Sequence, residues 1–448
     1  MGLGKLGACL AVTAAESEHK VIGVDIDPSI VEKVNRGIPH IREPQYDIKL
    51  ASAIKRGLSA TTSVEAAVLN SDITFIVVPT PSDPDGAFSL GALRPALADI
   101  GRALEKKTSY HLVVVVSTVL PGSCRYSLIP TLAAHCPSKS IGVDYGFAYS
   151  PEFIALGTVM KDIQNPDILL IGGHDEKSTD ILVRFYSEYV HNLPRIHAMS
   201  LENAELTKVA INTFLTAKIS FANSLAIACS RIPGGNVDIV TSAVGDDTRI
   251  GNKFLRGGLG YGGPCLPRDN RALSFIFYEL GVPHDLSDAT DEVNLGIPGA
   301  VMGLVQKKLG SDVSGKSALV CGITYKPGSS VVEESQGALI AHRLRNHGME
   351  VSVIDPDVDA DDLSAVGGDF SFHAFFDAHF MDYELVIIAT NDDCWKDFRR
   401  EWFNPDTIII DCWRILDDEF HAVPGYTPFG ISLVKPDDSH LEDLWTNR

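Results

Sequence analysis

The chain has little positive charge, no long apolar run and no paired cysteine motif. Its 448 residues include 38 Lys and Arg against 58 Asp and Glu, which gives a formal net charge of −20. This balance argues against a general binder of nucleic acid or of anionic membranes. Any anionic ligand would therefore be held by local cations or by helix N-termini, and not by the field of the whole protein.

The eight cysteines are scattered singly, and none forms a Cys-x-x-Cys pair. This pattern favours a reduced, cytoplasmic compartment over a disulfide framework, and no zinc or other metal site is predicted. Most of the cysteines are expected to be small buried hydrophobic residues.

Apolar runs of membrane-spanning length are also missing. The longest runs, such as residues 112–116, have the length of a strand, and no signal peptide is expected ahead of the first motif. A chain of this length is too long for a single hydrophobic core, so two or three domains are expected. We therefore expect a multidomain protein without a membrane partner.

The sequence opens with the spacing of a dinucleotide-binding turn. Gly2, Gly4 and Gly7 form G-x-G-x-x-G ahead of an apolar helical pattern, and residues 21–25 read as a strand that ends in Asp25. Glycines let a pyrophosphate approach a helix N-terminus, and an acid at this distance accepts the ribose hydroxyls. The acid favours NAD over NADP as the cofactor.

The strand that should precede this motif is missing, because only Met1 stands before Gly2. In a dinucleotide-binding fold that strand is the first and central one of the sheet. The chain is therefore expected to be truncated or to have a misassigned start. Unless another segment supplies the strand, the first domain should be badly destabilised.

Strands alternate with helices along the rest of the first half. Strand-like apolar runs stand at residues 73–78, 112–116, 147–150 and 168–171. This alternation predicts a mainly parallel sheet whose ligands lie at the carboxyl ends of the strands. Thr80, Thr118 and Glu152 each follow a strand, so we expect them at that edge.

Residues 201–230 form one helical pattern without Pro or Gly. The pattern is apolar around most of its circumference, as expected for a helix buried between domains or subunits, and it suggests at least a homodimer. Lys208 and Asn212 are four residues apart and therefore share one face of the helix. A capped salt bridge would also explain this pair.

A second alternating pattern follows residue 308, with strand-like runs at residues 318–322, 351–355, 385–389 and 407–411. The predicted fold class is α/β, with two Rossmann-like doubly wound domains joined by a long central helix. The predicted domains are residues 1–197, the central helical region 198–305, and residues 306–448.

A glycine-rich stretch leads to a single cysteine between two prolines. Five of the seven residues 257–263 are glycine, and Cys265 follows. Glycines remove side chains where a ligand or another backbone comes close, and the prolines restrict the loop that aims the thiol. With Arg268 and Asp269 nearby, the stretch looks like a thiolate nucleophile site. A flexible surface loop with a chance cysteine would also explain the glycines.

Several blocks of sequence match one known pattern. They are Gly2–Gly7, Val24-Asp25, Pro79–Pro81, Ser117–Val119, Ser150–Phe153, Glu205–Asn212, Arg249–Asp269 and Tyr325–Pro327. Through these blocks the chain resembles the nucleotide-sugar 6-dehydrogenase family over essentially its whole length. Simpler hydroxyacid dehydrogenases share the first-domain pattern but lack the cysteine block. The resemblance implies NAD-dependent oxidation of the primary alcohol of a nucleotide hexose to a carboxylate, in polysaccharide biosynthesis.

The resemblance also implies roles for individual residues. Cys265 would be the nucleophile, while Lys208 and Asn212 would stabilise the oxygen of the reacting carbon. Asp269, Glu152 and Thr118 would organise water and proton transfer. The residues expected at the cofactor are Gly2, Gly4, Gly7, Asp25, Thr80, Thr118 and Lys326.

A further set of residues is implied at the nucleotide-sugar substrate. These residues are Glu152, Phe153, Lys208, Asn212, Arg249, Phe254, Leu255, Gly262, Tyr325 and Lys326. Within this set, Arg249 would reach a sugar across a subunit interface, and Phe254 and Leu255 would line the base and ribose.

Two departures from the family pattern concern the cofactor. The family often has a second glutamate four residues after the position of Glu152, where this chain has Leu156. The arginine expected to face the cofactor phosphates is replaced by Glu333, which reverses the charge. NAD affinity and substrate choice are therefore expected to be affected, whereas the thiol, lysine, asparagine and aspartate are all present.

Three functions are compatible with these residues. The first is four-electron oxidation at C6 through a Cys265 thiohemiacetal and thioester. UDP-glucose is the leading substrate because Arg249–Arg256 follows that branch, although the residues around Cys265 also resemble the GDP-mannose branch. The second is a non-catalytic or impaired homologue that binds a nucleotide sugar, which the missing strand and Glu333 favour. The third is a two-electron hydroxyacid or alcohol dehydrogenase in which Cys265 is structural.

Overall fold

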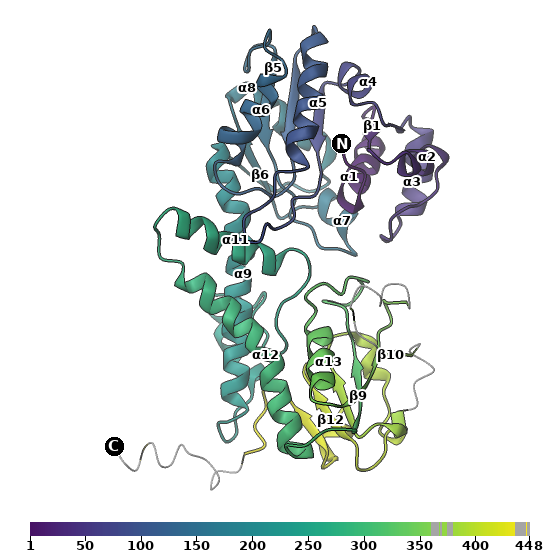
Figure 1. Cartoon of the computed structure of the whole chain (residues 1–448), viewed down its shortest axis with the longest axis vertical. Helices are drawn as coiled ribbons and strands as arrows, with labels where there is room; N and C mark the ends of the chain where they lie inside the picture. The colour runs from purple at the N-terminus through teal and green to yellow at the C-terminus, as the bar shows by residue number, and fades with distance from the viewer. Residues whose placement is uncertain (360–366, 368–369, 374–379, 435–444, 446–448) are drawn as a thin grey trace. The chain divides into compact units, whose positions relative to one another are not determined.

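The computed structural model describes residues 1–359, 367, 370–373, 380–434 and 445. The chain divides into two units, Met1–Ile211 and Asn212–Arg448, and the helix α9 (Leu201–Cys229) contains the boundary (Figure 1). The predicted division into residues 1–197, 198–305 and 306–448 stays a prediction, and parts of the third range lie outside the described residues. Within the described part of the chain, no helix is long and apolar enough to cross a membrane.

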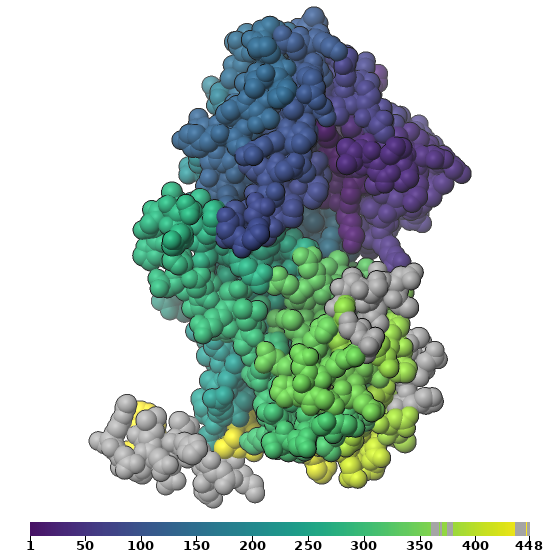
Figure 2. Space-filling model, viewed as in Figure 1, coloured from purple at the N-terminus to yellow at the C-terminus, as the bar shows by residue number. Residues whose placement is uncertain are grey.

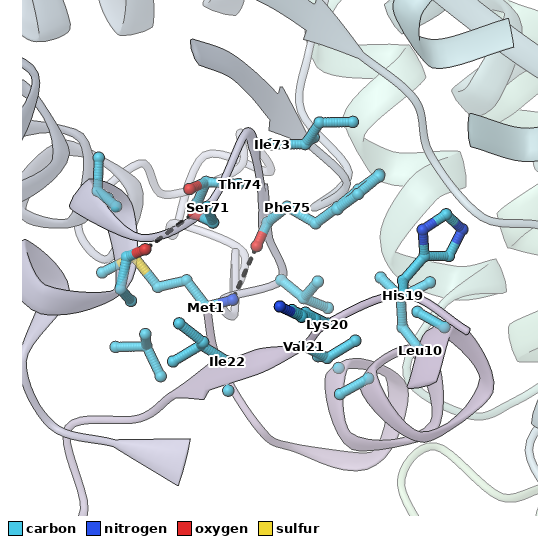
Figure 3. Close-up of a pocket in the computed structure, with 18 of the residues that line it drawn as sticks. Met1, Leu10, His19, Lys20, Val21, Ile22, Ser71, Ile73, Thr74 and Phe75 are labelled. Atoms are coloured by element: carbon cyan, nitrogen blue, oxygen red, sulfur yellow. Dashed lines mark hydrogen bonds between the residues drawn. The ribbon is translucent and has the colours of Figure 1, made fainter. Parts of the chain in front are cut away.

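The first unit holds two separate sheets where the sequence predicts one. β1 (Ile22–Val24) pairs in parallel with β2 (Ser59–Thr61), and these strands form a sheet of their own. The other sheet has the order β3-β4-β5-β6-β7. Its strands are β3 (Ile73–Ile76), β4 (His111–Val115), β5 (Tyr145–Tyr149), β6 (Ile168–Gly173) and β7 (Arg195–Met199). Met1 and Gly2 lie between β1 and β3, where Met1 bonds to Phe75 (Figure 3) and to Val77 on one side and Gly2 bonds to Val24 on the other.

The larger sheet is buried on both faces, as β4 illustrates. Leu112 and Val114 belong to a core formed with α1 and α8, whereas Val113 and Val115 belong to a core formed with α5. Alternate residues of a strand point to opposite faces, so a strand buried on both sides is apolar throughout. The sheet is parallel except for β5 and β6, which pair antiparallel, and the prediction of a mainly parallel sheet is confirmed.

Helices flank these strands. They are α1 (Lys5–Glu16), α2 (Pro28–Arg36), α3 (Tyr46–Lys55), α4 (Val64–Leu69), α5 (Leu93–Lys106), α6 (Ile129–Ala134), α7 (Val159–Gln164) and α8 (Glu176–Tyr189), with the short π-helix η1 (Cys124–Leu128).

The second unit contains one parallel sheet with the order β10-β9-β8-β11-β12-β13. Its strands are β8 (Ser317–Cys321), β9 (Glu350–Ile354), β10 (Ser371–Phe372), β11 (Leu385–Ile388), β12 (Ile408–Asp411) and β13 (Tyr426–Pro428). The chain proceeds outward from β8 in one direction and from β11 in the other, so the strand order reverses between them. Such a reversal marks the usual ligand crevice of a doubly wound sheet. The predicted second Rossmann-like domain is confirmed.

The helices of the second unit include three that precede this sheet in the chain. They are α10 (Val237–Asp246), α11 (Leu266–Glu279) and α12 (Asp285–Leu309), and α13 (Gln336–Asn346) follows β8.

The long central helix is confirmed as α9, which has 29 residues. Its apolar side chains are not all covered within the chain, because Phe214 is 67% exposed and Phe221 is 54% exposed. Large exposed apolar side chains close together on one helix are typical of a contact surface. The homodimer stays a prediction that these two residues favour.

A buried carboxylate joins the start of α9 to a loop of the first unit. Glu205 is fully buried, and its carboxylate accepts hydrogen bonds from the backbone N–H groups of Gly122 (2.6 Å) and Cys124 (2.7 Å). Cys124 begins η1, where unpaired N–H groups favour an anion. Burial raises the pKa of Glu205 because it disfavours the charged form. The hydrogen bonds from the two N–H groups offset part of this cost.

We expect Glu205→Ala to lower the free energy of unfolding of the first unit by about 2–4 kcal/mol, because two buried N–H groups lose their acceptor. Urea unfolding would measure the change. Glu202→Ala on the same turn is the matched control. It removes only the partly exposed ion pair with Arg125, so it should cost less than about 1 kcal/mol. Equal losses in the two variants would contradict the anchoring role.

Candidate functional site

In the glycine turn at the start of α1, two of the three glycines are packed closely against the backbone and the third faces open space. A Cβ atom on Gly2 would overlap the carbonyl oxygen of Val77, and one on Gly7 would overlap the carbonyl oxygen of Gly2. A Cβ atom on Gly4 would meet nothing within 4 Å. Gly4 is also the N-cap of α1 and makes no side-chain capping hydrogen bond. The helix N-terminus is therefore accessible to a phosphate, as dinucleotide binding requires.

Asp25, at the end of β1, lies against this turn. Its Oδ2 accepts a hydrogen bond from the backbone N–H of Leu3 (2.7 Å), and its Oδ1 accepts one from that of Asp27 (3.0 Å). A carboxylate has about four acceptor positions, so capacity is left for the hydroxyls of a ribose. Together with the glycine turn, the residues of the first unit fit a bound NAD.

Polar side chains after β3 and β4 tie the two strand ends together. The Thr80 hydroxyl donates to the carbonyl oxygen of Thr118 (2.8 Å). The Ser117 hydroxyl donates to the carbonyl oxygen of Val78 (2.6 Å) and accepts from its N–H (3.0 Å). The sequence predicted Thr80 and Thr118 at this edge but not the bridging role of Ser117. Both threonines follow their strands as expected.

Lys208 on α9 is held by the loop that follows β5. Its ammonium donates to the carbonyl oxygen of Glu152 (2.7 Å) and lies 4.4 Å from the centroid of the Phe153 ring. A cation over an aromatic face is stabilised by the ring quadrupole. Three residues predicted for the site are therefore adjacent in the first unit.

The carboxyl group of Glu152 is suited to proton transfer. Its Oε1 is fully buried and has no hydrogen-bond partner within the described part of the chain. Burial raises the pKa of Glu152 to about 7, although the Lys208 ammonium and the Tyr186 hydroxyl act in the opposite direction. A carboxyl that titrates near neutrality can both accept and release a proton. Tyr186, on α8, was not predicted.

Cys265 is the exposed thiol of this chain, since six of the other cysteines are buried and Cys394 is partly buried. Cys265 is the N-cap of α11, and its carbonyl oxygen accepts the N–H of Asp269 (2.8 Å). Pro267 lies in the first turn of that helix, where a missing N–H costs nothing. The loop that carries Cys265 therefore ends at the start of a helix, and the role of this thiol as a nucleophile stays a prediction.

Asp269 is fully buried and connects three parts of the second unit. Its Oδ1 accepts two hydrogen bonds from the guanidinium of Arg268 (3.0 and 2.9 Å). Its Oδ2 accepts the side-chain amide of Asn212 at 2.6 Å. The second unit therefore brings Cys265, Asp269 and Asn212 together.

Two buried asparagines hold the glycine-rich stretch. Asn223 on α9 accepts the N–H of Gly258 (2.9 Å) and donates to the carbonyl oxygen of Leu259 (3.2 Å). Asn294 on α12 accepts the N–H of Tyr261 (2.8 Å) and donates to its carbonyl oxygen (3.0 Å). These amide–backbone pairs fix the stretch, which rules out a flexible surface loop. Neither asparagine was predicted.

The glycines of this stretch are required by atoms of the protein itself. A Cβ atom on Gly260 would overlap the Asn294 amide, and one on Gly262 would overlap the carbonyl oxygen of Glu334. Gly263 has φ of +80°, which disfavours any residue with a Cβ atom. The loop before Cys265 is therefore rich in glycine because it packs closely against other parts of the second unit.

A cavity of about 340 Å³ lies within the second unit, at the carboxyl ends of β8, β11 and β12. This is the edge where the strand order reverses. Its lining includes the predicted residues Phe254, Gly262, Tyr325 and Lys326, and also Arg256, Gln336, Thr390, Asn391 and Trp413, which were not predicted.

The cavity combines aromatic faces with cations. Arg256 donates to the side-chain oxygen of Asn391 (3.1 Å) and to the carbonyl oxygen of Trp413 (2.9 Å), and its guanidinium lies 5.9 Å from the Trp413 ring centroid. The Lys326 ammonium lies 5.8 Å from the Tyr325 ring centroid. Flat aromatic surfaces next to cations suit a nucleobase followed by phosphates.

Some predicted residues lie elsewhere. Arg249 is exposed and forms an ion pair with Asp247 (2.6 Å). Leu255 is buried and does not line the cavity, so both roles stay predictions. Glu333 is exposed, while Leu156 packs against the hydrophobic core of the first unit, an environment that suits Leu better than the Glu expected there.

Three domain models of one family match successive parts of the chain. All are described as UDP-glucose/GDP-mannose dehydrogenase family. The NAD binding domain matches residues 1–190, the central domain matches residues 202–295, and the UDP binding domain matches residues 319–418.

Individual relatives carry names of the same family. The chain is 32% identical over 429 residues to a UDP-glucose 6-dehydrogenase of Haloferax volcanii, covering 94% of this chain and 93% of the relative. It is also 32% identical over 360 residues to a GDP-mannose 6-dehydrogenase of Pseudomonas aeruginosa, covering 80% of each. A solved UDP-glucose dehydrogenase from the archaeon Pyrobaculum islandicum superposes with a TM-score of 0.86 at 33% identity, covering 96% of this chain and 95% of that chain.

The raised pKa of Glu152 has a consequence for stability. The folded carboxyl holds its proton more tightly than the unfolded one, so stability falls as pH rises from about 4.5 through about 7. We expect Glu152→Gln to remove this fall. The variant should gain about 2–3 kcal/mol relative to the parent between pH 5 and pH 8, at ~1.4 kcal/mol per pKa unit.

Urea unfolding at the two pH values would measure this gain. Glu32→Gln, on the exposed surface of α2, is the matched control and should show a pH dependence like that of the parent. A Glu152→Gln variant whose stability follows the parent at both pH values would contradict the buried, protonatable carboxyl.

Proposed function

The chain belongs to the UDP-glucose/GDP-mannose dehydrogenase family and binds NAD, and on this basis we propose that it oxidises C6 of a nucleotide hexose to the uronic acid. The observation that carries the proposal is the exposed Cys265 thiol at the start of α11, one helical turn before Asp269, whose buried carboxylate accepts the side-chain amide of Asn212. A four-electron oxidation needs a nucleophile that holds the aldehyde between its two steps. A two-electron dehydrogenase has no use for one.

Cys265 would act after the first oxidation. NAD, when bound, supplies a hydride acceptor for each of the two oxidations. The Cys265 thiolate would add to the aldehyde carbon, which forms a C–S bond and leaves an oxyanion. Loss of the hydride from that carbon leaves a thioester, and water then cleaves the C–S bond to release the acid and the thiolate.

Lys208 and Asn212 would stabilise the oxyanion. They stand one turn apart on α9, and both side chains are donors of the kind that an oxyanion requires. Loss of one such donor typically costs about 2.7–4 kcal/mol of barrier stabilisation. The hydrogen bond from Asn212 to the buried Asp269 would fix the direction of its amide.

Glu152, Thr118 and Asp269 would manage water and protons. Glu152 is the best-placed acid–base group, because its pKa of about 7 lets it take a proton from the alcohol or from water at neutral pH. Thr118 follows β4 and is tied to Thr80, so it would contribute at the cofactor edge of the sheet.

UDP-glucose is the leading substrate. The UDP binding domain matches residues 319–418. Part of the lining of the second-unit cavity lies in this range, including Tyr325, Lys326 and Asn391. One relative is named UDP-glucose 6-dehydrogenase, whereas another of equal identity is named GDP-mannose 6-dehydrogenase. GDP-mannose is therefore the second substrate to test. A cytoplasmic homodimer engaged in polysaccharide biosynthesis is part of the same proposal.

A non-catalytic nucleotide-sugar binder is the second candidate function. The interrupted sheet of the first unit and the acid at Glu333 favour it, because both concern the cofactor and neither affects the cavity of the second unit. Turnover of any nucleotide hexose by the chain excludes this candidate.

We expect the chain to release two NADH per molecule of uronic acid when nucleotide hexoses are screened. Cys265→Ala should lower kcat for acid formation on the order of 10³-fold or more, because no thioester can form. NADH absorbance with product mass would measure both quantities. Cys394→Ala, at a cysteine outside the site, should keep parental activity. One NADH per sugar, or full acid formation by Cys265→Ala, would contradict the proposal.

Trp413→Ala tests the substrate cavity separately. Stacking on an aromatic side chain is worth about 1–3 kcal/mol per base. If Trp413 stacks on the nucleobase away from the reacting carbon, its loss should raise KM about tenfold and leave kcat nearly unchanged. Trp402→Ala, outside the cavity, is the control. A fall in kcat without a change in KM would place Trp413 near the chemistry instead.

A further inference from the structure

Gln336 is a buried polar residue that lines the cavity of the second unit. It is the first residue of α13, and it is 5% exposed. Side chains of this unit, mostly green and yellow-green in Figure 2, pack closely over the face shown. An amide buried in this way needs hydrogen-bond partners on the protein or on a ligand.

The orientation of the Gln336 amide is fixed by a neighbouring carbonyl group. Its Nε2 donates to the carbonyl oxygen of Tyr261 (3.4 Å), to which the side-chain amide of Asn294 also donates (3.0 Å). A reversed amide would place its oxygen against that carbonyl oxygen, and two acceptors repel each other. The nitrogen of the amide therefore faces Tyr261, and the oxygen lies on the other side.

The Oε1 atom of Gln336 is the part of this amide that lacks a partner. It is buried and accepts no hydrogen bond within the described part of the chain. The start of α13 does not need it, because the Ser335 hydroxyl caps the helix. That hydroxyl accepts the N–H of Ala338 (3.4 Å) and donates to the carbonyl oxygen of Thr324 (3.0 Å).

Close packing alone does not explain an amide at this position. A Cβ atom on Gly260 would lie 3.0 Å from the Cδ of Gln336, so the side chain fills space beside the glycine-rich stretch. A methionine would fill that space without burying an unpaired oxygen, which costs free energy. The oxygen therefore points to a hydrogen-bond donor that a ligand brings.

The cavity suits the nucleotide end of a nucleotide sugar. Its lining combines the flat side chains of Tyr325 and Trp413 with the cations Arg256 and Lys326. Cys265 does not line it, which leaves the reacting carbon of the sugar outside the cavity. The donor that meets Gln336 therefore belongs to the nucleotide.

Only some groups of a nucleoside diphosphate can satisfy an acceptor oxygen. The phosphate oxygens are themselves acceptors at neutral pH and are excluded. Uracil and guanine carry a ring N–H where cytosine and adenine carry a lone pair, and the ribose carries hydroxyl groups. These N–H and O–H groups are all part of the nucleoside.

We propose that Gln336 is a specificity-determining residue, whose Oε1 accepts a hydrogen bond from an N–H or O–H group of the substrate's nucleoside. It selects nucleotides that carry a donor at this point, and it rejects those that present a lone pair or no group there. The inference rests on the proposed function, because that function supplies a nucleotide sugar as the ligand.

Calorimetric titration of the full chain with nucleoside diphosphates tests this role without turnover. The probes are UDP, CDP, and the 2′-deoxy and 3′-deoxy forms of UDP. If the chain oxidises a GDP-linked hexose, GDP, ADP and the deoxy forms of GDP take their place.

The parent should bind at least one of the probes that lack a donor about tenfold more weakly than the complete nucleotide. In Gln336→Met this ratio should fall to within about twofold, because the acceptor is gone. The probe whose penalty disappears identifies the base or the ribose as the source of the donor.

Gln336→Asn is a second variant, which keeps a polar amide but withdraws its oxygen by one methylene group. It should lose the same ratio. Gln306→Met on α12, outside the cavity, is the matched control and should keep the parental ratios. Equal weakening of all probes by both Gln336 variants would show that Gln336 only packs the glycine-rich stretch, and it would overturn the proposal.

Acid formation distinguishes this proposal from the proposed function. If the parent forms the uronic acid while the Gln336 variants keep the parental ratios, only the role of Gln336 is overturned. If the parent binds none of the diphosphates and forms no acid from any nucleotide hexose, both are overturned.

Discussion

Two buried carboxylates fix the central helix, and the candidate catalytic groups depend on both. Glu205 and Asp269 are each fully buried, and a buried carboxylate is tolerated only when its oxygens are hydrogen-bonded. Glu205 binds two backbone N–H groups of the first unit, while Asp269 binds Asn212 and Arg268 in the second. Glu205 thereby fixes the start of α9 within the first unit, and Asp269 fixes the direction of the Asn212 amide within the second.

The difference between Cys265 and the other cysteines follows from position and not from residue type. Burial raises the pKa of Cys9 to about 12 and holds those of Cys124 and Cys321 well above the usual thiol value, so these thiols are inert at neutral pH. Cys265, by contrast, is exposed at the N-terminus of α11. The start of α11 thus fixes the backbone at Cys265, the thiol that the sequence predicts as the nucleophile.

Periodicity in the sequence predicted the parts of the fold that depend on local pattern. The alternating strands and the uninterrupted α9 were predicted because buried positions recur at regular intervals along a strand or helix, and apolar residues therefore recur at the same intervals in the sequence. Asn223 and Asn294 were missed because each bonds to a loop more than thirty residues away, and a single buried amide leaves no periodic signal. Asn391 and Trp413 follow strand ends in the second sheet, so the rule that placed Thr80 and Thr118 would have found them.

The glycine turn of the first unit and the loop before Cys265 are held by separate sets of hydrogen bonds. The glycine turn that faces the cofactor follows directly on the rung that Met1 and Gly2 form between β1 and β3. Met1 and Gly2 connect these strands through three hydrogen bonds, which constrain the turn at that point. The loop that carries Cys265 is held separately, by Asn223, Asn294 and Asp269 in the second unit. The hydrogen bonds that shape the glycine turn are therefore separate from those that hold the loop before Cys265.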